Sequence, residues 1–200
     1  MTQQQAIETV ADIFSLYELF GSADYIGEPV SQIEHMCQAA ELAEAEGYDE
    51  EVILAAFFHD IGHLCEYIMP AEQMNGYGVV DHEVLAGTYL REKGFSERVA
   101  KLAESHVLAK RYLTFKYPAY FERLSVASRE TLQQQGGVMN AAEAAAFESD
   151  PLHTLFIKLR EWDDLAKQEH KPLPSLQKYK DMAIRHLSNN LDHKTARNDD

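Results

Sequence analysis

Apolar residues recur along most of the chain at spacings of three and four positions, which place side chains on one face of an α-helix. In residues 6–20, Ile7, Val10, Phe14 and Tyr17 follow this spacing, and Gly21 is a suitable helix stop. The same pattern predicts further helices over 31–47, about 49–64, from near Asp81, over 96–113, shortly after Pro118, from Asn140, over 151–168 and over about 175–189. No segment has the strict alternation of a β-strand.

Local signals mark several boundaries of these helices. Ser31 with Glu34, and Asn140 with Glu143, have the spacing of a capping box at a helix N-terminus. Pro70 and the stretch 75–78 indicate a loop. The pattern therefore predicts one all-α domain, a bundle of roughly eight helices over residues 1–190, followed by a disordered tail over 191–200.

Composition and charge limit the environment and the partners. No apolar run approaches the roughly 20 residues that span a bilayer, and the N-terminus lacks the basic start and apolar block of an export signal. Cys37 and Cys65 form no close pair, so a cytoplasmic location is expected. The net charge of −15 disfavours nucleic acid as a partner but allows a small anionic substrate, and the oligomeric state stays open.

Histidines and aspartates supply the candidate chemistry. In the stretch "FFHDIGH", His59 and Asp60 end an apolar helix, and His63 follows one turn later. An acid in such a helix is costly unless its charge is compensated, and a metal ion does this well. Other candidate ligands are His35 near the start of the preceding helix, His82, His106, and Asp163 or Asp164 beside the single tryptophan. The remaining four histidines are treated as surface or core residues.

The ligand types narrow the choice of metal. Imidazoles with carboxylates, and no cysteine among them, suit iron, manganese or zinc rather than a structural zinc cage. Four histidines and two aspartates exceed what one ion usually needs. They suffice for two ions if Asp60 bridges them.

The pattern H…HD…D, formed by His35, His59-Asp60 and Asp163, resembles the HD-domain superfamily, all-α metalloproteins of which most are phosphohydrolases. Flanking stretches narrow the likeness, and they include "DYIGEPVSQIEH", "LAAFFHDIGH", "GFSERVA", "HVLAKRYL", "SVASRETL" and "REWDD". Together they resemble the PhnZ-type oxygenases, mixed-valent di-iron enzymes that cleave the carbon–phosphorus bond of 1-hydroxyphosphonates. The likeness extends over about residues 10–185.

The resemblance implies a di-iron centre. One iron would be held by His35, His59, Asp60 and Asp163, and the other by Asp60, His82 and His106. Asp60 would then bridge the two ions, and together the irons would activate dioxygen.

The resemblance also implies roles for residues around the metals. Tyr25 and Glu28, in "DYIGE", match a mobile pair, while His63, Lys110 and Ser128 match positions that contact the phosphonate. Lys110 follows His106 by four residues and so shares its helix face. Arg160, three residues before Asp163, matches a basic residue near the site, and it could equally hold that carboxylate in place.

The expected activity is therefore a dioxygenase that converts a 1-hydroxyphosphonate and O2 to a carboxylic acid and phosphate. Glu28, Asp81 and several tyrosines (Tyr25, Tyr77 and Tyr112) favour an amino or trimethylammonio group at C2, which would give glycine or glycine betaine. An HD-type phosphohydrolase of a nucleotide or phosphomonoester is the main alternative. An inositol-type di-iron oxygenase and a non-catalytic scaffold are less favoured, because the first does not need Lys110 and the second leaves two buried acids unexplained.

Overall fold

The computed structural model describes residues 1–25, 27–69, 72, 74 and 78–189. These residues form α-helices and no strand, apart from an isolated antiparallel bridge between Asp24 and Ser31, so the all-α prediction is confirmed. The predicted tail lies outside the described residues. The helices are α1 (Gln3–Phe20), α2 (Gln32–Ala45), α3 (Glu50–Phe58), α4 (Ile61–Cys65), α5 (His82–Glu92), α6 (Glu97–Ala103), α7 (Ser105–Lys116), α8 (Pro118–Arg123), α9 (Val126–Gln134), α10 (Ala141–Ser149), α11 (His153–Leu165) and α12 (Gln177–Asn189).

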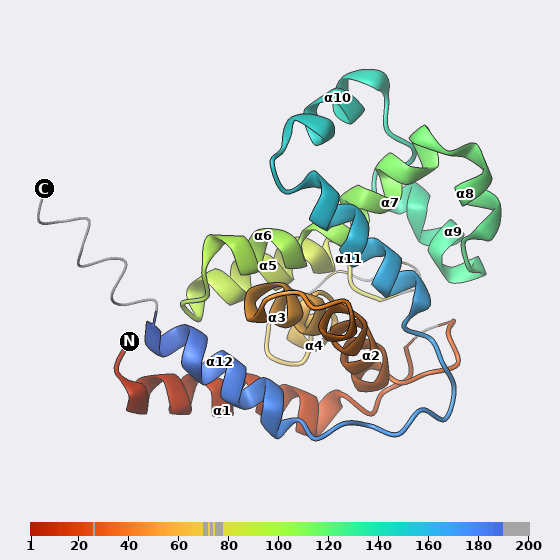
Figure 1. Cartoon of the computed structure of the whole chain (residues 1–200). Coiled ribbons are helices and arrows are strands. Elements are labelled where there is room, and N and C mark those ends of the chain that lie inside the picture. Colours follow the sequence, from red (N-terminus) through yellow and green to blue (C-terminus); the bar gives the residue numbers. More distant parts are fainter. Residues whose placement is uncertain (26, 70–71, 73, 75–77, 190–200) are drawn as a thin grey trace, which may run out of the picture.

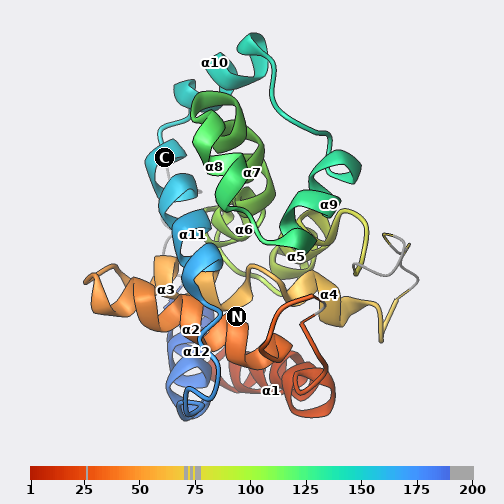
Figure 2. The same ribbon diagram turned by 90° about the vertical axis from the view of Figure 1, so that its right-hand side faces the viewer.

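The helices are arranged in three levels (Figures 1 and 2). Helices α1 and α12 pack together at one end, and α7 to α10 form the other end. Between them lie α2 to α6, and α11 runs from the upper level into the middle, where it packs on both α7 and α2. Aromatic side chains fill the core between α1, α3 and α12, with Phe14 stacked on Phe57 and Phe57 stacked on Tyr179.

Two predicted helices are each divided in two, and α9 forms in a segment for which no helix was predicted, so the described residues contain twelve helices rather than about eight. The helix expected over 49–64 ends at Phe58 and restarts at Ile61, and Asp60 leaves helical geometry with φ −103° and ψ 11°. The helix expected over 96–113 breaks at Glu104. Both breaks lie next to candidate metal ligands, so they change the direction in which those ligands point.

The predicted helix starts are confirmed at both capping boxes. The Ser31 hydroxyl accepts a hydrogen bond from the Glu34 backbone N–H, and the Glu34 carboxylate accepts from the Ser31 N–H. Asn140 and Glu143 make the same reciprocal pair at the start of α10. Each box satisfies backbone donors that a helix N-terminus otherwise leaves free.

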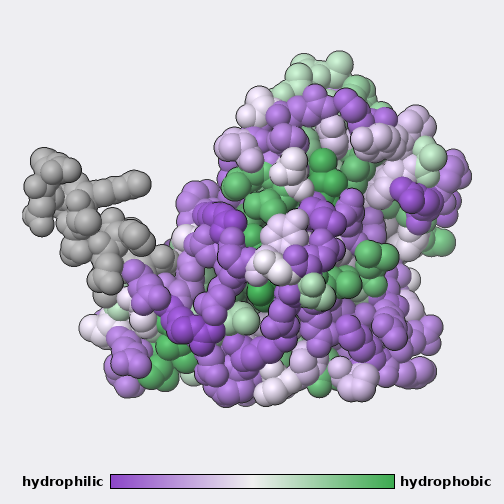
Figure 3. All heavy atoms as spheres, in the orientation of Figure 1, coloured by the Kyte–Doolittle hydropathy of each residue, from purple (hydrophilic) through white to green (hydrophobic). Residues whose placement is uncertain are grey.

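Hydrophilic residues predominate on the face of the molecule shown in Figure 3, as the net charge leads one to expect. No helix in the described part of the chain combines the length and the apolar character needed to cross a bilayer.

Candidate metal centre and adjoining pocket

Four buried histidines are oriented by the backbone. Each directs its Nδ1 atom at a carbonyl oxygen, His35 at that of Ala166 (2.9 Å), His59 at Ala56 (2.8 Å), His82 at Val79 (3.3 Å) and His106 at Ala103 (3.1 Å). A carbonyl can only accept, so each Nδ1 carries the proton and donates. Each Nε2 atom is therefore left with a lone pair that is free to bind a cation.

These Nε2 atoms converge in two pairs. The His35 and His59 Nε2 atoms lie 3.1 Å apart, and those of His82 and His106 lie 2.9 Å apart. Neutral rings in this arrangement would place two lone pairs face to face with no proton between them. A positive charge is needed between the rings of each pair.

Asp60 lies between the two pairs and offers one oxygen to each. Its Oδ2 atom lies 3.4 Å from the Nε2 atoms of both His35 and His59. Its Oδ1 atom lies 3.4 Å from His82 Nε2 and 3.3 Å from His106 Nε2. Both oxygens are buried and neither makes a hydrogen bond within the described part of the chain. A buried carboxylate without donors is unfavourable unless a cation compensates it.

Asp163 adds a second carboxylate to the first pair. Its Oδ1 atom lies 3.4 Å from His35 Nε2, while its Oδ2 atom accepts a 2.6 Å hydrogen bond from Arg160. Potential ligand atoms of His35, His59 and Asp163 all lie within 4.8 Å of one another. Trp162, the preceding residue, is fully buried and donates to Glu46, so α11 is fixed where it presents Asp163.

The charges agree with a cation site. Burial raises the pKa of Asp60, but the neighbouring imidazoles, above all His59, hold it well below its usual value, so the carboxylate is ionised. Burial likewise lowers the pKa of His35, yet hydrogen bonding and charge from Asp163 and Asp60 raise it to about 9. The two carboxylates thus favour a positive charge at His35 Nε2, which either a proton or a metal ion can supply. Acceptor atoms with two ionised carboxylates fit one or more metal ions, and the mixture of imidazole and carboxylate suits iron, manganese or zinc.

The break between α3 and α4 allows these ligands to meet. In "HDIGH", Gly62 packs so closely on α5 that an added Cβ would lie 1.9 Å from the His82 carbonyl oxygen. Only glycine permits this approach. The stretch therefore supplies two ligand candidates of its own and brings His82 beside them.

His63 is placed as a hydrogen-bond donor rather than as a ligand. The Val79 backbone N–H donates to its Nδ1 atom (3.2 Å), which leaves the proton on Nε2. Burial lowers its pKa to about 3, so the ring is neutral. It stacks on His82 with ring centres 4.0 Å apart, and Gly78 packs so closely on the ring that an added Cβ would lie 2.6 Å from His63 Cε1. Its atoms also fall within 4.8 Å of ligand atoms of Asp60 and His82.

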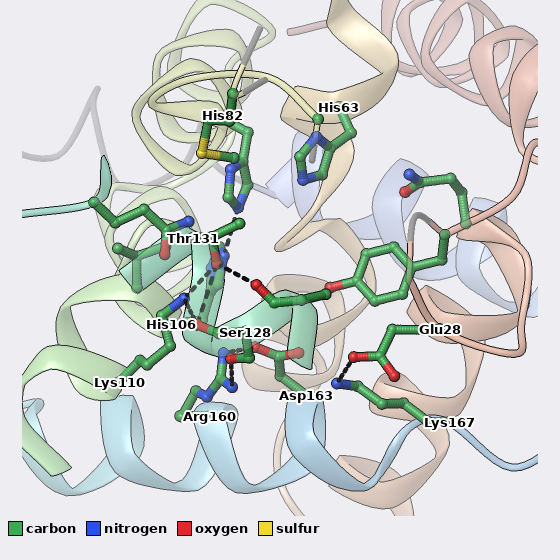
Figure 4. Close-up of a pocket in the computed structure, with 17 residues that line it drawn as sticks. Glu28, His63, His82, His106, Lys110, Ser128, Thr131, Arg160, Asp163 and Lys167 are labelled. Atoms are coloured by element: carbon green, nitrogen blue, oxygen red, sulfur yellow. Dashed lines mark hydrogen bonds and ion pairs between the residues drawn. The ribbon is translucent and has the colours of Figure 1, made fainter. Parts of the chain in front are cut away.

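A pocket opens beside His82 and His106 (Figure 4). It is lined by Tyr25, Glu28, Gln32, His63, Met74, Gly78, His82, His106, Val107, Lys110, Ala127, Ser128, Thr131, Gln135, Arg160, Asp163 and Lys167. These residues come from the loop before α2, from α2, α4, α5, α7, α9 and α11, and from the segments before α5 and after α9 and α11, so the pocket joins the upper and middle levels of the fold.

Lys110 supplies a buried cation to this pocket. Its side chain is 2% exposed, and its ammonium donates to the Ser128 carbonyl (3.3 Å) and the Thr131 hydroxyl (3.1 Å). No carboxylate of the described residues pairs with it. Burial, with the charge of Arg160, lowers its pKa to about 7. An anion bound here would restore the charged form, so the site fits a phosphonate or phosphate group.

Arg160 organises the base of the pocket. Its guanidinium donates to Asp163, to Asp164, to the Ser128 hydroxyl (3.0 Å) and, through Nε, to the Tyr120 hydroxyl (2.9 Å). Tyr120 in turn donates to Asp164 (2.5 Å). The donors of Arg160 face protein groups, so the structure favours the role of holding Asp163. Ser128 lines the pocket beside it.

Tyr25 and Glu28 lie in the loop before α2. The Tyr25 ring stacks on His35 at 4.2 Å, and burial, then the charges of Asp60 and Asp163, raise the pKa of its hydroxyl. The Glu28 carboxylate accepts a 2.7 Å hydrogen bond from the Lys167 ammonium. All of the predicted pocket residues thus line one space, but Glu28 already has a cationic partner.

The sequence did not indicate three contributors: Lys167, Thr131 and Tyr120. Asp164, the alternative to Asp163 as a candidate ligand, instead accepts hydrogen bonds from Arg160 and Tyr120. Thr131 follows Ser128 by three residues on α9, a spacing that could have indicated it. Lys167 carries no such signal, because it lies in the loop after α11. Of the residues suggested for a cationic substituent, Tyr112 stacks on Phe147 and donates to Glu148, away from the pocket, and Tyr77 lies outside the described residues.

Comparisons with known proteins agree with this geometry. The HD domain family matches residues 33–152. An uncharacterized protein, L432, of Acanthamoeba polyphaga mimivirus is 47% identical over 185 residues, 92% of this chain and 84% of its own. The [1-hydroxy-2-(trimethylamino)ethyl]phosphonate dioxygenase (glycine-betaine-forming) of Leisingera caerulea is 35% identical over 184 residues, 90% of each chain. The hydroxymethylphosphonate dioxygenase of Gimesia maris is 39% identical over 175 residues, 86% of this chain and 85% of its own.

These matches, with the converging histidines and aspartates, establish the class: the chain belongs to the HD domain family. Within that family it is a PhnZ-type oxygenase, an enzyme of the dioxygenase class.

Proposed function

We propose that this chain cleaves the carbon–phosphorus bond of a 1-hydroxyphosphonate with O2, releasing phosphate and a carboxylic acid. The observation that carries the proposal is that a candidate site for two metals adjoins a pocket with a buried lysine. Asp60 divides its oxygens between two histidine pairs, and the second pair faces a pocket that contains the buried cation Lys110. A centre for two metals beside a site for an anion could place the phosphonate group next to the ions that activate O2. The names of two relatives support the same substrate class.

The centre would hold two iron ions in a mixed-valent state. His35, His59, Asp163 and Asp60 would bind the first ion, and Asp60, His82 and His106 the second. The two ions together would supply the activation of O2 and the redox chemistry at C1. The protein would supply ligand orientation, since the backbone carbonyls fix each imidazole with Nε2 free.

The pocket residues would position the phosphonate. Lys110 uses two of its three N–H donors on Ser128 and Thr131, and the third would bind a phosphonate oxygen. The neutral His63 ring would donate its Nε2 proton to the same group. Ser128 would contact the phosphonate while its hydroxyl accepts from Arg160. Each contact orients C1 toward the metals.

Tyr25 and Glu28 would act as the movable side of the site. The Tyr25 ring covers His35, and its raised pKa keeps the hydroxyl protonated. We expect substrate binding to displace this side chain and Glu28 to close over the substituent on C2. A 2-amino or 2-trimethylammonio group would give glycine or glycine betaine, and an unsubstituted substrate would give formate. One relative is named for a trimethylamino substrate and another for hydroxymethylphosphonate, so both kinds of substrate are candidates.

The test is phosphate release from racemic 1-hydroxy-2-aminoethylphosphonate, its trimethylammonio analogue and hydroxymethylphosphonate, with iron and a reductant, in air and under argon. Phenyl phosphate serves as the control. We expect phosphate only in air and only from hydroxyphosphonates. Phosphate from phenyl phosphate under argon would instead identify a metal-dependent phosphohydrolase, in which a metal-activated water attacks phosphorus.

A further inference from the structure

Lys167 forms the wall of the pocket opposite Lys110, and it is the partner of Glu28 (Figure 4). We propose that Lys167 is a specificity-determining residue that neutralises Glu28 and thereby selects 1-hydroxyphosphonates without a cationic substituent. The proposal rests on the function proposed above and narrows its substrate class. It opposes the preference for an ammonio group that Glu28 alone would indicate.

The Lys167–Glu28 ion pair is largely buried, so water screens its charges only weakly. The Lys167 and Glu28 side chains are 16% and 9% exposed, and the nitrogen–oxygen distance is 2.7 Å. Charge pairs with little solvent contact are screened weakly, and removing one partner leaves the other uncompensated. A substrate ammonium could reach Glu28 only by displacing the Lys167 ammonium.

The backbone that carries Lys167 is fixed on both sides. The carbonyl of Ala166 accepts from His35, one of the candidate metal ligands. Gln168 makes two hydrogen bonds with the Gln38 side chain, one through its N–H (2.9 Å) and one through its carbonyl (3.0 Å). The backbone at Lys167 is therefore held in place. The loop could move the Lys167 side chain out of the pocket only by breaking its hydrogen bonds to α2.

The other described groups that line the pocket do not provide a binding partner for a substrate ammonium group. Among the described lining residues the carboxylates are Glu28 and Asp163, and Asp163 is held by Arg160. Tyr25 is the lining aromatic, apart from the histidines, and its ring is already stacked on His35. A cage of aromatic faces around a quaternary ammonium is thus not built from the described residues. Hydroxymethylphosphonate, or a 1-hydroxyphosphonate with a small neutral substituent, fits this charge pattern better.

The experiment measures kcat/KM for phosphate release from hydroxymethylphosphonate, 1-hydroxyethylphosphonate and 1-hydroxy-2-aminoethylphosphonate. The variants are Lys167→Met, which removes the charge, and Lys167→Arg, which keeps it. Lys171→Met serves as a matched control. Lys171 lies four residues after Lys167, and it forms an ion pair with Glu41 at the surface. We expect the wild type to prefer the neutral substrates by about tenfold or more. Lys167→Met should narrow or reverse this ratio, whereas Lys167→Arg and Lys171→Met should retain it.

Binding without turnover separates this proposal from the proposed reaction. Ethylphosphonate and 2-aminoethylphosphonate lack the 1-hydroxyl group, and calorimetry under argon compares their affinities for iron-loaded wild type and variants. Preference of the wild type for ethylphosphonate, lost in Lys167→Met, supports the role of Lys167 even if no phosphonate is cleaved. A wild type that prefers the amines, binds neither ligand, or has a ratio that Lys167→Met leaves unchanged would overturn it.

The converse variant keeps the test decisive if Lys167→Met does not fold. Glu28→Gln leaves Lys167 without its anion while preserving the size of the side chain. We expect this variant to gain affinity for phosphonoacetate, whose carboxylate can occupy the place of Glu28, by about tenfold relative to ethylphosphonate. No gain would contradict the inference that Lys167 is available to a pocket ligand.

Discussion

The two halves of the metal centre differ in how they face the pocket. His35 and His59 are fully buried and do not line it, and both lie near Asp163 and near one oxygen of Asp60. His82 and His106 line the pocket, and among the described residues Asp60 supplies the carboxylate oxygen near their Nε2 atoms. The first half is rich in anionic donors and enclosed, whereas the second has fewer protein ligands and is open.

This difference suggests a division of labour. More negative charge near a metal favours the ion of higher charge, so we expect the enclosed half to hold the Fe(III) ion of the proposed centre. Fewer protein ligands leave coordination positions for other molecules, and the open half adjoins the anion-binding residues. Asp60 contacts both halves, so we expect the halves to depend on each other. Variants in each half therefore test the comparison directly.

The largest effect is expected from Asp60→Asn. The amide keeps the shape but removes the charge that both halves share, so both ions should be lost and activity should fall on the order of a thousandfold or more. Iron content per chain, measured after reconstitution, checks this result. Asp181→Asn, which changes an exposed acid bonded to Gln177, is the matched control. Two irons retained in Asp60→Asn would contradict the bridging role.

Paired variants of the two halves should separate the ions. His106→Ala removes a ligand from the open half and should leave about one iron per chain, held by the enclosed half. His35→Ala should lower the iron content further, because it also removes the contact between Asp163 and the centre and the bond to the Ala166 carbonyl. Iron analysis and thermal unfolding with and without iron provide the measurement. Equal loss in both variants would mean that the halves do not differ.

A smaller effect is expected from Lys110→Met, which leaves the metals in place. Loss of the buried ammonium should raise KM by about tenfold to a hundredfold with iron content unchanged. Lys116→Met, on the same helix but paired with Glu148 at the surface, is the control. A normal KM in Lys110→Met would show that the phosphonate binds elsewhere.

The pH dependence of phosphonate binding gives an independent test of the role of Lys110. With a pKa of about 7 in the free protein, Lys110 is protonated below pH 7 and loses its proton above it. An anion binds the protonated form, so binding above pH 7 must take up a proton, and affinity should fall by up to about tenfold per pH unit. Wild type should lose affinity more steeply than Lys110→Met as pH rises, which titration of the same phosphonate in both proteins measures.

Helical periodicity predicted the fold class because it is local information, carried by residues three and four positions apart. The breaks at Asp60 and Glu104 were not predicted. They depend on tertiary contacts, Gly62 against the His82 carbonyl in the first case and Glu104 against Arg91 in the second. A sequence pattern that is apolar on both sides of a break reads as one continuous helix.

The candidate site shows the same limit. The histidines and aspartates could be picked out because imidazoles and acids in apolar helices are conspicuous. The ion pair of Glu28 with Lys167 could not be predicted, because Lys167 lies 139 residues away and looks like an ordinary loop lysine. The role of a site residue that the sequence identifies therefore depends on its partners in the folded structure, which the sequence pattern does not show.

The smallest expected effect concerns Tyr120, which reaches the enclosed half only through Arg160. Its hydroxyl accepts from Arg160 Nε and donates to Asp164, so Tyr120→Phe removes one bond from the group that holds Asp163. A single hydrogen bond is worth about 1 kcal/mol, and kcat should fall by roughly twofold to fivefold with KM unchanged. Tyr117→Phe, at an exposed position, is the control. Because Arg160 keeps its bonds to both aspartates, iron content should also be retained. Loss of iron in Tyr120→Phe would contradict this expectation and would mean that metal binding in the enclosed half depends on the hydrogen bond between Tyr120 and Arg160.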